Sequence, residues 1–155
     1  MKRSGILNPG LCRAIASLGH GDVLMVVDAG FPIPASVDRI DLAIAQDFPD
    51  LRSVLSLVHS EFIAENVTFA AEMAENNPLL HAWLLDEFAD TEFEAVPHTE
   101  MLTTMAASAR TVVRTGAFDP WGNIALRSGV DVPRWFTKDG VRVPEYYRER
   151  MTAGG

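Results

Sequence analysis

Two of the four histidines lie in loops at the ends of predicted strands, where folded domains often carry their binding and catalytic groups. His20 is flanked by glycine on both sides, and His98 follows a proline. Imidazole titrates near neutral pH, so a histidine in such a loop can accept or donate a proton during a reaction. His59 and His81 instead fall within predicted helices beside apolar stripes, a position typical of surface or capping histidines. His20 and His98 are therefore the candidates for acid/base chemistry.

Asp28 directly follows the apolar run 23–27 and precedes a loop rich in glycine and proline. In open α/β sheets, ligands bind beyond the carboxyl ends of strands, so Asp28 is a candidate for binding a ligand. A helix cap or a turn explains such an aspartate equally well. Asp22, two residues after His20, is more typical of a residue that orients the imidazole or caps a turn.

Trp121, Gly122 and Asn123 place an aromatic ring and a side-chain amide beside a glycine. The ring could pack on the face of a sugar while the amide bonds sugar hydroxyls, although the segment is equally an ordinary turn sequence. Two histidines and an aspartate could instead form a non-haem iron site. We consider that alternative weaker than acid/base catalysis and expect no metal.

Composition narrows the choice of partner. The 155 residues carry a formal net charge of −8, and the single cysteine excludes an intrachain disulfide. The electrostatic field of this negative charge repels nucleic acid and anionic lipid surfaces. An uncharged metabolite is therefore the partner that fits best. The sequence has neither a signal-peptide pattern nor a run of about 18 apolar residues. We expect a soluble cytoplasmic protein.

The elements that must position these residues follow from the apolar patterns. Run 23–27 lacks alternation and predicts a strand buried on both faces. Asn-Pro pairs at 8–9 and 77–78 predict helix starts, because asparagine caps a helix and proline suits its first turn. The buried stripe of the second helix is predicted at Leu80, Leu84, Leu85 and Phe88. Further strands are predicted at 39–44, 66–71, 92–96, 111–113 and 123–126, and further helices at 51–58 and 99–109. This alternation predicts a layered α/β domain with a largely parallel or mixed sheet.

The length of the buried strand constrains any site that uses both of its ends. At about 3.3 Å per residue, an extended segment from Asp22 to Asp28 separates its ends by roughly 20 Å. His20 and Asp28 of one chain are then too far apart to grip one small ligand. Either two subunits share the site, or the chain folds back sharply at the glycines around His20.

Five segments match, in order, the motifs of one known family. They are Leu18–Asp22, Asp28–Pro34, Arg39–Asp41, His98 and Gly122–Ile124. Together they resemble the D-ribose pyranases of the RbsD and FucU group, over about residues 1–130. The segments Pro32–Pro34 and Arg39–Asp41 are closer to the ribose branch than to the fucose mutarotase branch.

The resemblance implies a layered α/β/α fold and a cofactor-free cytoplasmic enzyme that interconverts the pyranose and furanose forms of ribose or a related monosaccharide. It also implies a homo-oligomer, a ring-shaped decamer in the better-known members. The family's histidine general acid matches His20. Its substrate-binding positions match Asp28, His98, Trp121, Gly122 and Asn123. An L-fucose-type mutarotase and a non-catalytic sugar-binding or regulatory protein are the alternatives.

The chain departs from the family pattern in two places. Trp121 stands where the family usually has tyrosine, so an indole N–H replaces a phenolic hydroxyl. Residues 131–155 form an extension beyond the family-like domain 1–130. Aromatic residues in this extension indicate that it packs on its own or a neighbouring subunit.

Overall fold

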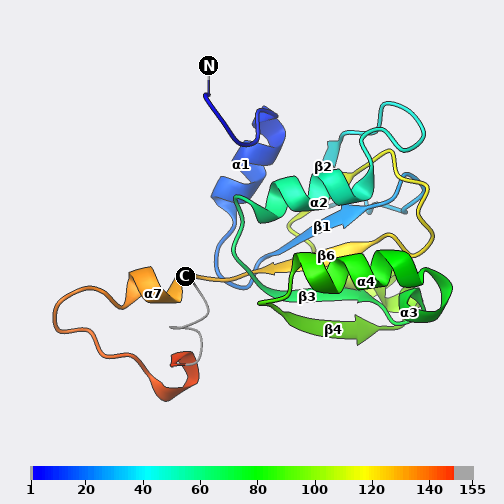
Figure 1. Cartoon of the computed structure of the whole chain (residues 1–155). Coiled ribbons are helices and arrows are strands. Elements are labelled where there is room, and N and C mark those ends of the chain that lie inside the picture. Colours follow the sequence, from blue (N-terminus) through cyan, green and yellow to red (C-terminus); the bar gives the residue numbers. More distant parts are fainter. Residues whose placement is uncertain (1, 149–155) are drawn as a thin grey trace.

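The computed structural model describes residues 2–148, in which six strands form one sheet of order β2-β5-β1-β6-β3-β4 (Figure 1). The strands are Val23–Val27 (β1), Asp38–Asp41 (β2), Ala64–Ala70 (β3), Glu92–Val96 (β4), Thr111–Arg114 (β5) and Ile124–Ser128 (β6). Strand β6 runs antiparallel to β1 and β3, and the other neighbouring pairs are parallel. The predicted largely parallel or mixed sheet is confirmed.

Helices cover both faces of the sheet. One core layer joins it to α1 (Pro9–Ser17), α2 (Leu51–His59), α3 (Met73–Asn76) and α4 (Pro78–Glu87). The other layer joins it to a helical segment made of α5 (His98–Glu100), the π-helical η1 (Met101–Met105) and α6 (Ala106–Ser108). The layered α/β/α architecture is therefore confirmed.

Strand β1 lies at the centre of both core layers. Leu24 and Val26 pack on the side of α2, whereas Val23, Met25 and Val27 pack on the side of η1. All five side chains are buried, which confirms the prediction from the unbroken apolar run.

Both Asn-Pro helix starts are confirmed. The side-chain oxygens of Asn8 and Asn77 accept hydrogen bonds from the backbone N–H groups of Leu11 and Leu80, and a proline follows each cap. The buried stripe of α4 is only partly as predicted, because Leu85 is 37% exposed. Consecutive helical residues differ by about 100° around the axis, so Leu85 points away from the core that Leu84 enters.

Several strand limits differ from the prediction, among them the end of β2 and the start of β3. Strand β2 ends at Asp41, not at residue 44, because the Asp41 carboxylate accepts a hydrogen bond from the Ala43 N–H (3.1 Å) and turns the chain. Strand β3 begins two residues earlier than predicted, at Ala64. This earlier start adds Glu65 to the sheet.

After β6 the extension forms two short helices, α7 (Val132–Trp135) and the 3₁₀ helix η2 (Glu145–Tyr147), with a loop between them that projects from the domain (Figure 1). The helices in the described part of the chain are all too short or too polar to span a bilayer.

Candidate functional site

The sheet places the candidate residues at two opposite edges. Strands β1 to β5 all run in one direction, so their carboxyl ends meet at one edge, which we call the carboxyl edge. Asp28 follows β1 there, and Asn123 precedes the antiparallel β6 at the same edge. His20 precedes β1 at the opposite, amino edge. The structure thus separates His20 from Asp28 by the full length of β1, as the strand length predicted.

A tight turn presents His20 at the amino edge. Asp22 accepts a hydrogen bond from the Gly19 N–H through its carboxylate (2.8 Å) and so caps the turn. Gly21 has a φ of 85°, a left-handed conformation that glycine adopts at little cost. Its N–H donates to the carbonyl of Ser128 at the end of β6 (2.8 Å). The turn is therefore fixed to the sheet while the imidazole points outward.

The His20 ring meets a carboxylate that the sequence analysis did not single out. His20 Nε2 lies 2.9 Å from Glu65 Oε2, and the His20 side chain is 43% exposed against 19% for Glu65. The pairing of β3 with β6 shifts register between Ala64 and Asn66, so Glu65 occupies a β-bulge. Bulges redirect side chains next to functional sites. His20 and Glu65 are 45 positions apart, and no sequence motif links them. The only signal for Glu65 in the sequence is a carboxylate next to the start of a predicted strand.

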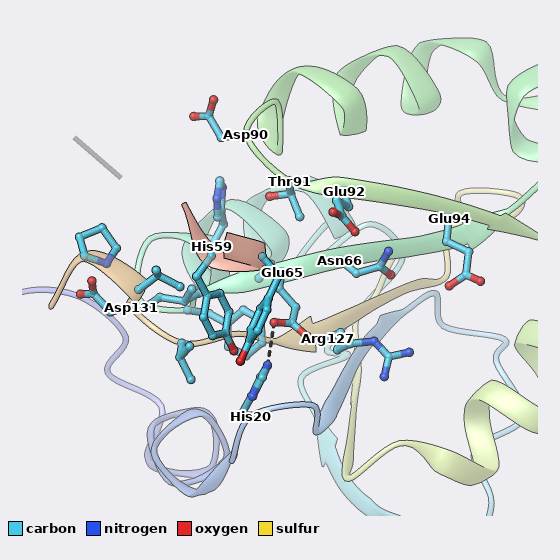
Figure 2. Close-up of a pocket in the computed structure, with 18 residues that line it drawn as sticks. His20, His59, Glu65, Asn66, Asp90, Thr91, Glu92, Glu94, Arg127 and Asp131 are labelled. Carbon is cyan, nitrogen blue, oxygen red and sulfur yellow. Dashed lines mark hydrogen bonds and ion pairs between the residues drawn. The ribbon is translucent and has the colours of Figure 1, made fainter. Parts of the chain in front are cut away.

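His20 and Glu65 project into a cavity of about 860 Å³ at the amino edge (Figure 2). Its charged lining residues are mostly carboxylates: Glu65, Asp90, Glu92, Glu94 and Asp131 stand beside Arg127, His20 and His59. Tyr146 and Tyr147 of the extension belong to the same lining. The volume lies within the range of small-molecule sites, and the acidic lining disfavours anionic ligands.

The carboxyl edge holds Asp28 through its backbone. The Asp28 N–H donates to Oδ1 of Asn123 (3.2 Å), whose side chain is 1% exposed. One Asp28 carboxylate oxygen accepts from the Gly30 N–H (2.7 Å), which makes Asp28 a turn residue as well as a ligand candidate. Asn123 thus lies buried behind Asp28, and its carbonyl oxygen fixes the loop that carries the carboxylate.

Trp121 and Gly122 form the turn before Asn123. Trp121 has a φ of 58°, a strained conformation for a bulky residue, and its ring packs against both core layers. A Cβ at Gly122 would lie 2.8 Å from the carbonyl oxygen of Asp119. Gly122 is therefore required, because the backbone of the turn leaves no room for a side chain at this position. Trp121 serves at least in part to pack the core.

Asp119 adds a carboxylate to the carboxyl edge that the sequence analysis also missed. Burial raises the pKa of Asp119, and repulsion from Asp47, Asp50 and Asp28 raises it further, against the opposing effect of Arg52. Several negative charges therefore lie around Asp119, and the carboxylate of Asp28 is one of them. This edge, like the cavity at the other edge, is unfavourable for an anion.

His98 lies at the carboxyl edge but at the far side of the sheet. It follows β4, and strands β6 and β3 lie between β4 and β1. Its backbone N–H donates to both carboxylate oxygens of Glu72 (2.9 and 3.1 Å). The structure therefore brings Asp28 and Asn123 into contact and leaves His98 several strands away.

The other two histidines have local partners. His59, at the end of α2, lies 3.1 Å from a carboxylate oxygen of Glu87 and stacks on Phe88. His81 packs beside Phe69. Within residues 2–148, no group of three or more His, Cys, Asp or Glu side chains is arranged to hold a metal ion. The iron-site alternative receives no support from this geometry.

Comparison with known proteins decides the family. The model of the RbsD / FucU transport protein family matches residues 1–131. This chain belongs to the RbsD / FucU family. The family resemblance inferred from the motifs is confirmed, and the match ends where the extension begins.

Named relatives within the RbsD / FucU family fall into two lengths. The chain is 63% identical to D-ribose pyranase 2 of Rubrobacter xylanophilus, over 97% of both chains. It is 54% identical to D-ribose pyranase 1 of Streptomyces griseus, over 97% of this chain and all of that one. The structure of Bacillus subtilis RbsD complexed with D-ribose superposes with a TM-score of 0.80 at 35% identity, covering 84% of this chain and 98% of that one.

Proposed function

We propose that this protein is a D-ribose pyranase, an isomerase that interconverts the pyranose and furanose forms of the sugar, with His20 as its proton-transfer group. The observation that carries the residue assignment is the His20–Glu65 pair, an imidazole held at 2.9 Å by a carboxylate and directed into a cavity of monosaccharide scale or larger. The names of the two long relatives support the same reaction.

The reaction needs only proton transfer. Ring opening removes the proton of the anomeric hydroxyl, breaks the bond between the anomeric carbon and the ring oxygen, and gives that oxygen a proton. Closure by a different hydroxyl reverses these steps and forms the other ring. Because Nε2 of His20 faces Glu65, the other ring nitrogen, Nδ1, exchanges the proton with the sugar. Glu65 orients the ring through this contact, and such acid/base catalysis supplies on the order of 10² to 10⁴ in rate.

The charges around both edges favour an uncharged substrate. Carboxylates line the His20 cavity, and Asp28 shares its edge with three more aspartates. A sugar phosphate would be repelled at either edge, whereas a free monosaccharide offers hydroxyl donors to these acceptors. We therefore expect free ribose, and not a phosphorylated sugar, to be the substrate.

We further propose that two copies of the chain share each site. His20 and Asp28 lie at opposite ends of β1, roughly 20 Å apart by strand geometry, so one monosaccharide cannot bridge them within one copy. Exposed Ile44, Phe48 and Phe118 lie in neighbouring loops at the carboxyl edge. Apolar side chains gathered in this way are typical of subunit interfaces, and a second copy docked there would bring its His20 toward Asp28. A closed ring, decameric as in the family's better-known members, satisfies this head-to-tail contact.

In the shared site the carboxyl edge binds and orients the sugar. Asp28 accepts hydrogen bonds from sugar hydroxyls with the carboxylate oxygen that does not bond Gly30. Asn123 holds Asp28 in place and offers its amide, and the Trp121 ring supplies an apolar surface for the sugar. Gly122 permits the turn. A role of His98 as second acid/base or binding group stays a prediction, because strands β6 and β3 separate β4 from β1 within one copy.

Saturation-transfer NMR on ribose tests this function directly. The wild-type protein should accelerate exchange between pyranose and furanose signals, and His20→Ala should lose about 10² to 10⁴ of that acceleration. His81→Ala is the matched control, because His81 packs on Phe69, does not line the His20 cavity and is not a proposed site residue, so it should exchange ribose as the wild type does. A His20→Ala protein as active as the wild type contradicts the assignment. Fucose in parallel samples tests the mutarotase alternative.

A further inference from the structure

Residues 131–148 extend beyond the part of the chain that matches the family, yet they return to the His20 cavity. We propose that this extension supplies Tyr146 and Tyr147 as sugar-contacting residues that set affinity for the substrate. The inference rests on the proposed function. It adds two residues of the extension to the groups that contact the sugar in the His20 cavity.

The start of the extension is anchored to the domain. Val130 and Val132 are buried, and the Asp131 carboxylate accepts a hydrogen bond from the Arg134 N–H (3.1 Å), which caps α7. Asp131 and Val132 also line the cavity, together with Pro133. The base of the extension is therefore part of the cavity wall and not a detached arm.

Aromatic contacts hold the second half of the extension. The rings of Tyr146 and Tyr147 lie 4.7 Å apart between centroids, and Phe136, just after α7, lies 5.6 Å from the Tyr147 ring. Aromatic pairs at such separations contribute beyond the area they bury. Phe136 thus links the two ends of the projecting loop and keeps η2 against the cavity that His20 enters.

These tyrosines differ chemically from the rest of the lining. Carboxylates are the most numerous kind of polar group in the cavity, and an ionised carboxylate only accepts hydrogen bonds. A phenol both donates and accepts, and its ring packs on the C–H face of a sugar, so the tyrosines offer what carboxylates lack. Tyr146 is 75% exposed, so its ring is available to a ligand and is not a core residue.

The comparisons indicate that the domain does not need the extension to fold. Bacillus subtilis RbsD covers 84% of this chain with 98% of its own length, so it is shorter by about the length of the extension. The Rubrobacter and Streptomyces relatives align over 97% of this chain and so include the extension. A segment that is added to a complete fold and lies against its cavity is suited to tuning substrate affinity.

Tyr146→Phe and Tyr147→Phe, alone and together, test the inference, because they keep both rings and remove the hydroxyls. Saturation-transfer rates measured over a range of ribose concentrations should show KM raised about three- to tenfold in the double variant, the usual effect of losing a hydrogen bond to a neutral group, with kcat within twofold of the wild type. Trp135→Ala is the matched control, since Trp135 belongs to the same extension, is 60% exposed and is not part of the cavity lining; its KM should equal that of the wild type.

Three outcomes would overturn the inference. The first is an unchanged KM in both the Phe double variant and the Tyr146→Ala/Tyr147→Ala double variant. The second is an equal rise of KM in Trp135→Ala. The third is a change of particle mass by light scattering in the Ala double variant with no change of KM, which would make the extension a subunit contact. If the wild-type protein itself does not accelerate exchange, the proposed function fails instead, so the two failures are distinguishable.

Discussion

At the amino edge, His20 stands on an open glycine turn and its ring meets Glu65; at the carboxyl edge, Asp28 is tied through its backbone to the buried Asn123. The first arrangement leaves a titratable ring accessible and lets one carboxylate orient it. The second fixes a carboxylate in a closely packed turn. The difference supports the proposed roles, in which one edge transfers protons, the other holds the sugar, and neither edge is complete without the other.

The largest expected effect tests whether the two edges cooperate across subunits. His20→Ala and Asp28→Ala are each expected to be nearly inactive in saturation transfer. When the two inactive proteins are unfolded and refolded together, random assembly into a ring restores both residues at about a quarter of the shared sites, and activity should rise to about that fraction. No recovery in particles shown by light scattering to be mixed would place the site within one copy.

The next effect concerns the partner of the proton-transfer group. Glu65→Gln keeps the size of the side chain but removes the carboxylate that orients the His20 ring, so kcat should fall about tenfold with little change of KM. Glu87→Gln is the matched control, since Glu87 forms the other histidine–glutamate pair, with His59. Equal losses of kcat in the two variants would mean that Glu65 has no special role.

Gly122 and Gly19 show that the backbone is packed more closely at the carboxyl edge than at the amino edge. A Cβ at Gly122 would lie 2.8 Å from a backbone oxygen, whereas at Gly19 its nearest neighbour is a carboxylate oxygen of Asp22 at 3.7 Å. Gly122→Ala should lower the free energy of unfolding by about 1–3 kcal/mol, as overpacking does, while Gly19→Ala should be nearly neutral. Urea unfolding followed by circular dichroism measures both, and equal values would remove the contrast.

The smallest effect is electrostatic and belongs to the carboxyl edge. Burial and the neighbouring aspartates raise the pKa of Asp119, so the folded state resists its ionisation and loses stability as the pH rises through the raised pKa. Asp119→Asn should therefore stabilise the fold slightly at pH 7, by no more than about 1 kcal/mol, and so raise Tm. The difference should vanish below about pH 3, well under the ordinary aspartate pKa, where the carboxyl is protonated in both states. A Tm increase that persists at low pH would have another origin.

The sequence predicted features that depend on local pattern. The unbroken run of β1 indicated burial on both faces, and the Asn-Pro pairs located two helix starts. The length of β1 indicated that His20 and Asp28 could meet within one copy only if the chain folded back sharply at the glycines around His20. The carboxyl-edge turn around Trp121 and the cap at Asp22 were also foreseen as turn chemistry.

Features that depend on register between distant strands could not be predicted. Glu65 meets His20 because a bulge in β3 shifts its pairing with β6, and no residue pattern near Glu65 records that shift. The sequence predicts Asn123 as a polar turn residue, yet it is buried, and its side-chain oxygen accepts a hydrogen bond from the Asp28 backbone. The raised pKa of Asp119 depends on carboxylates from three other segments of the chain. In each case the partner comes from elsewhere in the fold.

The reversed direction of β6 has a mechanical consequence. The residue before this strand bonds the Asp28 backbone, and its last residue, Ser128, accepts from Gly21 and donates to the carbonyl of Asp22. One rigid strut of five residues therefore sets the distance between the His20 turn and the Asp28 loop, the two proposed halves of the site. In a head-to-tail ring, that strut is the spacer that fixes how far apart successive reaction centres repeat around the circumference.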